Sequence, residues 1–291
     1  MATPKQAATC SGDTREKPRA LISCTMASLL LTVRIDRPHF GSHFGKQVTH
    51  FSANINRIAL LRNSRDNGLP DLLHAAKTIL DAGADGITVH PRPDERHIRM
   101  EDIAPLAALL AQYPDREFNI EGNPHHNLMA IVEAALPQQA TFVPDAVAVS
   151  TSNRGFAAGA EMDAVQPLIA RLKAKGVRVS VFVDAEISAV EAAHAAGADR
   201  IELYTEPYAV AFVAGGASSA EVALQKFVVA ASRAREIGLG VNAGHDLNLH
   251  NLPDFIREVA PDEVSIGHAL IADAIWLGLD GATRRYIAAC R

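Results

Sequence analysis

An alternation of short β-branched segments with Ala/Leu-rich segments constrains the fold of this chain most strongly. From about residue 47, eight runs typical of strands are separated by stretches with helical spacing of apolar residues. Repeated strand–helix units of this kind are typical of a parallel (β/α)8 TIM barrel. The expected strands are 50–55, 86–89, 117–120, 140–143, 177–183, 200–204, 240–241 and 263–266.

Helix-stop signals support this alternation. The segment 72–85 places apolar residues on one face and ends near Gly83, and 189–200 ends in the same way near Gly197. A longer helix is expected over 222–240. An open doubly wound sheet is the alternative, but it would want a glycine-rich fingerprint after the first strand, where the chain reads NINRIALLRNSR. We therefore favour the barrel.

Composition bounds the domain organisation and the partners. Residues 1–46 show no periodicity, so we expect a disordered N-terminal extension followed by a single barrel domain over 47–291. The net charge of −5 argues against a nucleic-acid surface. No apolar run reaches the roughly 20 residues that span a bilayer, so no membrane is expected. The 3 cysteines have no metal-binding spacing, which favours a reduced, cytoplasmic protein.

Polar residues follow the expected strands. In a (β/α)8 barrel these positions meet on one face, which carries the active site. Asn54, Asn56 and Arg57 follow the first strand, while the third ends in Glu121 and the sixth contains Glu202. We therefore predict the active site at this rim. The remaining candidates there are His90, Arg92 and His97 after the second strand, Asp145 and Thr151 after the fourth, Asp184 after the fifth, NAGHD (242–246) and GHAL (267–270).

Three of these residues suit proton transfer. Glu121 ends an apolar strand, where partial burial would raise the pKa of its carboxyl and favour a general base. His90 and His245 end two separate strands, and imidazole passes protons near neutral pH. The alternative is structural: an arginine-paired or solvent-facing glutamate, and histidines that only satisfy local hydrogen bonds.

Two Gly-His pairs indicate anion binding. Gly244-His245 and Gly267-His268 follow the seventh and eighth strands, where barrels of this kind commonly seat a phosphate. Arg62 and Arg65 lie in LLRNSRDNGLP, which we interpret as a flexible segment that could close over a second anion. A solvated loop is the alternative for these arginines.

Two missing patterns argue against two classes of enzyme. A metal-dependent hydrolase on this barrel typically carries His-x-His on the first strand, where this chain has Asn54-Ile55-Asn56. A Schiff-base enzyme needs a lysine at a strand end, and no lysine stands there. Carbonyl chemistry would therefore use the amine of a substrate, with protein acids and bases moving protons.

Taken together, these motifs identify a resemblance. The chain from about residue 50 to 279 resembles the pyridoxine 5'-phosphate synthase family. The matching segments are NINRIALLRNSR, AGADGITVHPRPDERHI, FNIEGNP, VSVFVD, GADRIELYT, GLGVNAGHDLNLHNL and VSIGHALI, in the order of the family. The second and sixth together are highly specific for it.

The resemblance implies a fold and a reaction. Members are (β/α)8 barrels with extra helices, usually homo-octamers built from dimers. They are transferases that condense 1-deoxy-D-xylulose 5-phosphate with 3-amino-2-oxopropyl phosphate to pyridoxine 5'-phosphate, inorganic phosphate and water. The family needs no metal and no organic cofactor.

The resemblance also assigns roles to residues. It implies that His90 and Glu121 accept protons, that His245 donates one, and that Glu202 orients a catalytic group or meets the substrate amine. The aminoketone phosphate would be held by Asn54, Arg65, Asp246, Gly267 and His268. The deoxyxylulose phosphate would be held by Asn56, Arg57, Arg92, His97 and Thr151.

Three departures from the family pattern bear on these contacts. Asn56-Arg57 stands where members commonly have Asp-His, Asp246 stands where some have glycine, and the loop 144–155 lacks the usual charges. Two rival functions follow. One is an aldolase or isomerase acting on another phosphosugar, and the other is a phosphate-binding relative without turnover.

Overall fold

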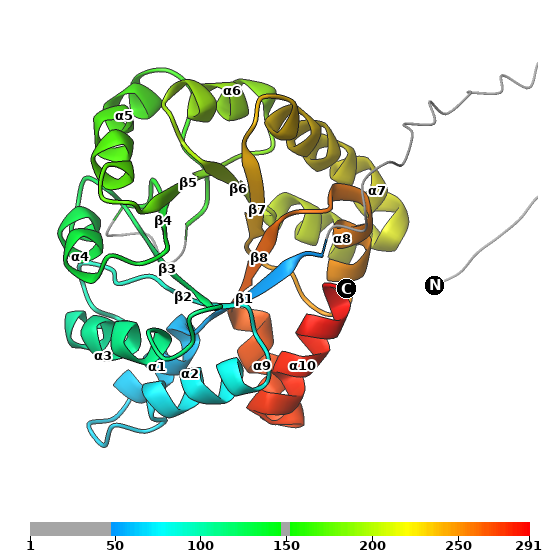
Figure 1. The fold of residues 1–291 in the computed structure, drawn as a ribbon. Coiled ribbons are helices and arrows are strands. Elements are labelled where there is room, and N and C mark those ends of the chain that lie inside the picture. The colour runs from blue at the N-terminus through cyan, green and yellow to red at the C-terminus, as the bar shows by residue number, and fades with distance from the viewer. Residues whose placement is uncertain (1–47, 147–151) are drawn as a thin grey trace, which may run out of the picture. The chain divides into compact units, whose positions relative to one another are not determined.

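The structure, a computed structural model, describes residues 48–146 and 152–291. Its eight strands are parallel and pair in sequence order, with β1 returning to β8, so the predicted closed (β/α)8 barrel is confirmed (Figure 1). The predicted extension 1–46 lies outside the described residues. The strands are β1 (His50–Asn54), β2 (Gly86–Val89), β3 (Glu117–Gly122), β4 (Gln139–Phe142), β5 (Arg178–Val183), β6 (Arg200–Tyr204), β7 (Gly240–Gly244) and β8 (Glu263–Ile266).

Helices surround the barrel on its outer side (Figure 1). In the described part of the chain, none of them is both long and apolar enough to cross a membrane. They are α1 (Asn56–Asn63), α2 (Leu72–Asp81), α3 (Met100–Leu110), α4 (Leu128–Ala135), α5 (Ala160–Lys173), α6 (Ile187–Ala195), α7 (Glu206–Glu236), α8 (Leu252–Val259), α9 (His268–Leu277) and α10 (Leu279–Ala289).

Two helices differ from the sequence-based expectation. The segment after β1, which we expected to be flexible, begins as helix α1 and is helical to Asn63. Helix α7 has 31 residues and begins at Glu206, well before the expected start at 222. The glycines at 215 and 216 lower helix propensity there, but Leu224 and Phe227 farther along the same helix pack in the buried core.

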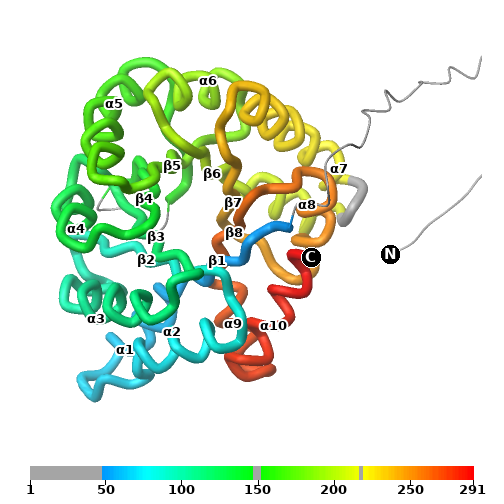
Figure 2. The backbone as a smooth tube through the Cα atoms, viewed as in Figure 1, coloured from blue at the N-terminus to red at the C-terminus, as the bar shows by residue number. Residues whose placement is uncertain are grey.

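Extra helices complete the ring around the strands. Helix α10, the last helix of the chain, packs against α9, α2 and β1 (Figure 2). It therefore lies beside elements from both the beginning and the end of the barrel. Its Tyr286 ring stacks on Phe51 of β1 with the ring centroids 5.7 Å apart. Helix α9 begins directly after β8, which places its N-terminus at the rim where the strands end.

The strands alternate between apolar residues that face the helices and polar residues in the interior of the barrel. Phe51, Ile120 and Val181 are fully buried in the large hydrophobic core. Between such positions stand buried polar side chains that bond to one another across strands. These bonds run from Asn119 Nδ2 to Thr88 Oγ1 at 3.3 Å, from Thr141 Oγ1 to Asn119 Oδ1 at 3.1 Å, and between the hydroxyls of Ser52 and Thr88 at 2.7 Å.

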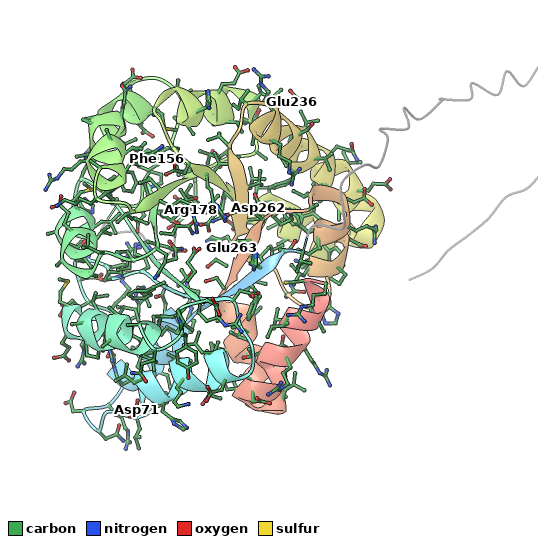
Figure 3. All side chains as sticks on the ribbon, viewed as in Figure 1. Asp71, Phe156, Arg178, Glu236, Asp262 and Glu263 are labelled. Carbon is green, nitrogen blue, oxygen red and sulfur yellow. The ribbon has the colours of Figure 1, made fainter. Side chains whose placement is uncertain are left out.

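Ion pairs fill the barrel at the N-terminal ends of the strands. Arg178 Nη2 pairs with Glu117 Oε2, and Arg200 Nη1 lies 3.8 Å from Glu263 Oε2. Arg178 and Glu263 both lie toward the middle of the barrel, whereas Glu236 lies on its outer rim (Figure 3). Buried charges are tolerated when they are paired in this way. The opposite end of the barrel is open and carries the candidate site.

Candidate active site

A cavity of about 660 Å³ opens where the strands end. It brings together residues that are far apart in the sequence and come from nearly every strand end. Of the residues to which the resemblance assigns a role, all except Arg65 and Thr151 line it. Those that do are Asn54, Asn56, Arg57, His90, Arg92, His97, Glu121, Glu202, His245, Asp246, Gly267 and His268.

Two of the arginines after β1, Arg62 and Arg65, do not line this cavity. Arg65 is exposed just beyond α1, and its proposed role stays a prediction. Arg62, which we expected to close over an anion, instead pairs with Asp102, with its Nη2 2.9 Å from Oδ2. That expectation was wrong because Arg62 lies inside a helix and faces α3. Thr151 lies outside the described residues.

His90 and Glu121 form the centre of the site. His90 Nδ1 lies 3.9 Å from Glu121 Oε2, and Asn54 Nδ2 donates to the same oxygen at 3.5 Å. The turn after β1 holds this arrangement, because Asn56 Oδ1 accepts a hydrogen bond from the backbone N–H of His90 at 2.9 Å. Asn56 in turn donates its own N–H to Asn54 Oδ1 at 3.0 Å.

Burial raises the pKa of the carboxyls of the site. Burial raises the pKa of Glu121 well above its usual range, and the negative charges of Glu202, Glu263 and Asp145 raise it further. A hydrogen bond from Ser265 opposes this shift. Burial raises the pKa of Glu202 to about 7. A carboxyl that titrates near neutral pH, as that of Glu202 does, can exchange protons with a substrate in both directions.

Burial lowers the pKa of the histidines of the site. Loss of solvation lowers the pKa of His90 to about 3 and that of His97 to about 4, and nearby arginines contribute to both shifts. The pKa of His245 is also lowered, mainly by burial. Their imidazoles are therefore neutral at pH 7, so each ring carries one proton donor and one acceptor.

His245 sits on a strained turn after β7. Its φ is 89° and that of Asp246 is 57°, a left-handed region that non-glycine residues adopt rarely. Thr205 Oγ1 donates to the carbonyl of Gly244 at 2.8 Å, and Asn251 Nδ2 donates to that of Asp246 at 3.2 Å. Strain held by surrounding bonds is typical of functional sites.

The proton of the His245 ring is placed by a loop contact. His245 Nε2 lies 2.9 Å from the carbonyl oxygen of Ser152, which can only accept a hydrogen bond. Nε2 therefore carries the proton in the neutral ring, and Nδ1 carries the lone pair. Tyr204 of β6 meets the ring edge-on, with the centroids 5.1 Å apart.

The mouth of the cavity is cationic. Arg57, Arg92 and Arg96 line it, opposite the start of helix α9 at Gly267 and His268. Backbone N–H groups at a helix N-terminus and guanidinium groups both favour anions. A Cβ at Gly267 would stand 3.1 Å from Asn54, so the absence of a side chain lets this end approach the site. The mouth therefore suits substrates that carry phosphate groups.

Helix α1 holds the loop between β2 and α3 in place. Asn63 Nδ2 donates to the carbonyl oxygens of His97 at 2.8 Å, Arg96 at 3.1 Å and Glu95 at 3.3 Å. Arg62 Nη2 adds a bond to the carbonyl of His97 at 3.2 Å. These contacts fix the backbone that carries the cationic residues of the rim.

Sequence reasoning missed several residues of the site. Ser152, Arg96 and Ser265 line the cavity, but isolated serines and a charged loop residue give no distinctive pattern. Asp145, already a candidate from the sequence, follows β4 and is buried. Across the described ranges, no group of three or more His, Cys, Asp or Glu side chains is arranged to hold a metal ion.

A closed parallel barrel with buried acid–base groups and a cationic mouth defines a (β/α)8-barrel enzyme that acts on anionic substrates. Residues 51–291 match the family described as "Pyridoxal phosphate biosynthesis protein PdxJ". The chain therefore belongs to the PdxJ family.

Two relatives agree with this assignment. Pyridoxine 5'-phosphate synthase of Albidiferax ferrireducens is 52% identical over 245 residues, which cover 82% of this chain and 96% of that protein. The enzyme of the same name from Cytophaga hutchinsonii is 48% identical, with 82% and 98% covered. The crystal structure of the Amycolatopsis orientalis BexX/CysO complex has a TM-score of 0.55 at 15% identity, covering 83% of this chain and 89% of that one, and shows the fold alone.

Proposed function

We propose that Glu121, His90 and His245 move the protons of the reaction that this family catalyses. The chain condenses 1-deoxy-D-xylulose 5-phosphate with 3-amino-2-oxopropyl phosphate and yields pyridoxine 5'-phosphate, inorganic phosphate and water. The observation that carries the assignment of residues is the His90–Glu121 contact, 3.9 Å long and buried at the floor of the cavity.

The steps follow from the chemistry of the two substrates. The substrate amine attacks the ketone of the sugar phosphate and forms an imine with loss of water. Glu121 and His90 accept the carbon-bound protons that must leave for dehydration and enolisation. His245 donates a proton to the departing hydroxyl.

The later steps close the ring. The phosphate of the sugar leaves, water adds in its place, an intramolecular aldol-type closure forms the second bond between the two fragments, and loss of the resulting hydroxyl as water makes the ring aromatic. Holding both substrates side by side converts the condensation into an effectively intramolecular step, which is worth roughly 7–11 kcal/mol of the barrier. The cationic mouth supports this role, because both substrates carry a phosphate.

The two substrates would occupy different sides of the mouth. The sugar phosphate would contact the loop that Asn63 holds, through Arg92 and His97, together with Asn56, Arg57 and Thr151. The aminoketone phosphate would lie at the start of α9, where backbone N–H groups face the cavity. Its contacts would be Asn54, Arg65, Asp246, Gly267 and His268, and Glu202 would meet its amine.

A stoichiometric assay tests the reaction against its rivals. Purified protein is mixed with both substrates, and pyridoxine 5'-phosphate and released phosphate are counted, with each substrate omitted in turn. We expect one phosphate per product and none when either substrate is absent. Turnover of the sugar phosphate alone would indicate an aldolase or isomerase, and binding without turnover would indicate a non-catalytic relative.

We also propose that the protein forms a homo-octamer built from dimers and lies in the cytoplasm. The exposed side chains of Ile275 and Trp276 on α9, 72% and 85% accessible, support a contact with another copy. Analytical ultracentrifugation tests the assembly. Trp276→Glu should lower the molar mass, whereas Arg284→Glu on the neighbouring helix should not; a wild-type monomer would contradict the proposal.

A further inference from the structure

Asp145 lies between two residues of the site and has no role in the mechanism described above. Its carboxylate oxygen Oδ2 pairs with Arg92 Nη1 and lies 3.6 Å from His90 Nε2. Only 4% of the Asp145 side chain is accessible. Glu121 approaches the other ring nitrogen of His90, at 3.9 Å from Nδ1. The imidazole therefore lies between two carboxyl groups, one at each nitrogen.

The position of Asp145 is fixed by hydrogen bonds from neighbouring loops. Asn123 Nδ2 donates to the carbonyl of Asp145 at 3.0 Å, and Arg92 Nη2 donates to that of Ala146 at 2.8 Å. Asn127 Nδ2 donates to the carbonyl of Pro91 at 3.0 Å, which holds the backbone next to His90. The β3–α4 loop thus bonds to the backbone of Asp145 and to that of the residue after His90.

The contact decides which nitrogen of His90 carries the proton. A neutral imidazole has a single N–H, and a carboxylate paired with arginine is an acceptor only. A proton on Nε2 would point at Asp145, and the lone pair of Nδ1 would then face Glu121 and the cavity. The reverse tautomer would turn a lone pair toward the Asp145 carboxylate and would be repelled.

We propose that Asp145 is a positioning residue that holds His90 as the Nε2–H tautomer, so that Nδ1 accepts the substrate proton. This inference rests on the proposed role of His90. Asp145 contacts His90 and Arg92 but does not line the cavity. It therefore acts through the histidine.

Other charged groups also face His90. Glu121 lies at Nδ1, and Arg92, Asp94, Arg96 and His97 come from its own loop. Of these, Asp94 accepts a hydrogen bond from Arg96 Nε at 2.8 Å. Asp94→Asn is therefore the matched control, because it removes one negative charge near His90 without touching Nε2.

The test is Asp145→Leu, read by long-range ¹H–¹⁵N correlation spectra of histidine-labelled protein. The same oxygen, Oδ2, meets Arg92 and faces His90 Nε2, so an asparagine would keep its amide oxygen there, whereas leucine is of similar size and removes the acceptor. We expect the His90 ring to change to the Nδ1–H form and kcat to fall on the order of 10²–10⁴-fold. KM for the aminoketone phosphate should stay within about twofold. Asp94→Asn should keep the Nε2–H form.

Two further variants separate the alternatives. Asp145→Glu should restore the Nε2–H form and part of kcat. In an Arg92→Met background, Asp145→Leu should still change the tautomer; no further change there would mean that Asp145 acts only through Arg92 and would overturn the proposal. An Nε2–H ring in Asp145→Leu would also overturn it. The spectra need no turnover, so failure of the proposed function is seen separately, as absence of product from the wild type.

Discussion

Gly244 lies so close to Glu202 that a Cβ at position 244 would stand 2.4 Å from Glu202 Oε1. The glycine thus provides the space in which the buried carboxyl of β6 reaches the cavity. We expect Gly244→Ala to displace Glu202 and to lower the rate of product formation by at least about tenfold. The control is Gly281→Ala, where the nearest atom to the new Cβ is Leu277 Cβ at 3.8 Å. Wild-type activity in Gly244→Ala would contradict this account.

The buried Glu202 should make stability depend on pH. Burial raises its pKa from 4.5 to about 7, so between these values the folded protein keeps a proton that the unfolded chain has lost. Stability contributed by the neutral carboxyl is complete below pH 4.5 and is lost as pH rises through 7. By pH 8 the loss is about 3 kcal/mol, at about 1.4 kcal/mol per pKa unit.

Glu202→Gln removes this cost, because an amide does not ionise. We expect the variant to exceed the wild type in free energy of unfolding at pH 8, with the gain shrinking toward pH 5. Urea denaturation at both pH values measures this difference. Glu236→Gln, an exposed change on α7, should give no such trend. A gain that is independent of pH would show that ionisation is not its cause.

Asn63 should control the affinity for one substrate only. Its amide bonds to three successive carbonyls of the loop that carries Arg92 and His97. We expect Asn63→Ala to raise KM for the sugar phosphate about tenfold, because the loop must then be ordered at the cost of binding energy. KM for the aminoketone phosphate should change little. Initial-rate kinetics with each substrate varied in turn measures both constants.

The matched control for Asn63 is Gln112→Ala. Gln112 is exposed at the end of α3, and its amide bonds only to the carbonyl of Ala108 at 3.4 Å. It should leave both KM values unchanged. Equal KM values in Asn63→Ala and the wild type would show that the hydrogen bonds from Asn63 to the loop are not needed for binding.

Much of the site could be predicted from strand ends. Parallel strands bring their C-terminal residues to one rim, so Glu121, His90 and His245 could be placed together from the alternation alone. The polar interior could have been read as well, because strands such as EFNIEG and RIELY alternate between apolar and polar residues.

Pairings between distant residues could not be predicted. The contact of His245 with Ser152 joins positions 93 apart, and that of Arg92 with Asp145 joins positions 53 apart. Such contacts depend on how two loops pack, and neither loop has a periodic pattern. Arg62 is another such residue: the sequence suggested that it could bind an anion, but it lies in helix α1 and pairs with Asp102.

The proposed mechanism depends most on Glu121 acting as a buried base. Single-turnover formation of pyridoxine 5'-phosphate, followed by mass spectrometry, compares the wild type with Glu121→Gln and with Glu258→Gln, an exposed control on α8. We expect Glu258→Gln to match the wild type and Glu121→Gln to lose about 10²–10⁴-fold in rate while both substrates still bind. A Glu121→Gln variant that forms product at the wild-type rate would contradict the central claim.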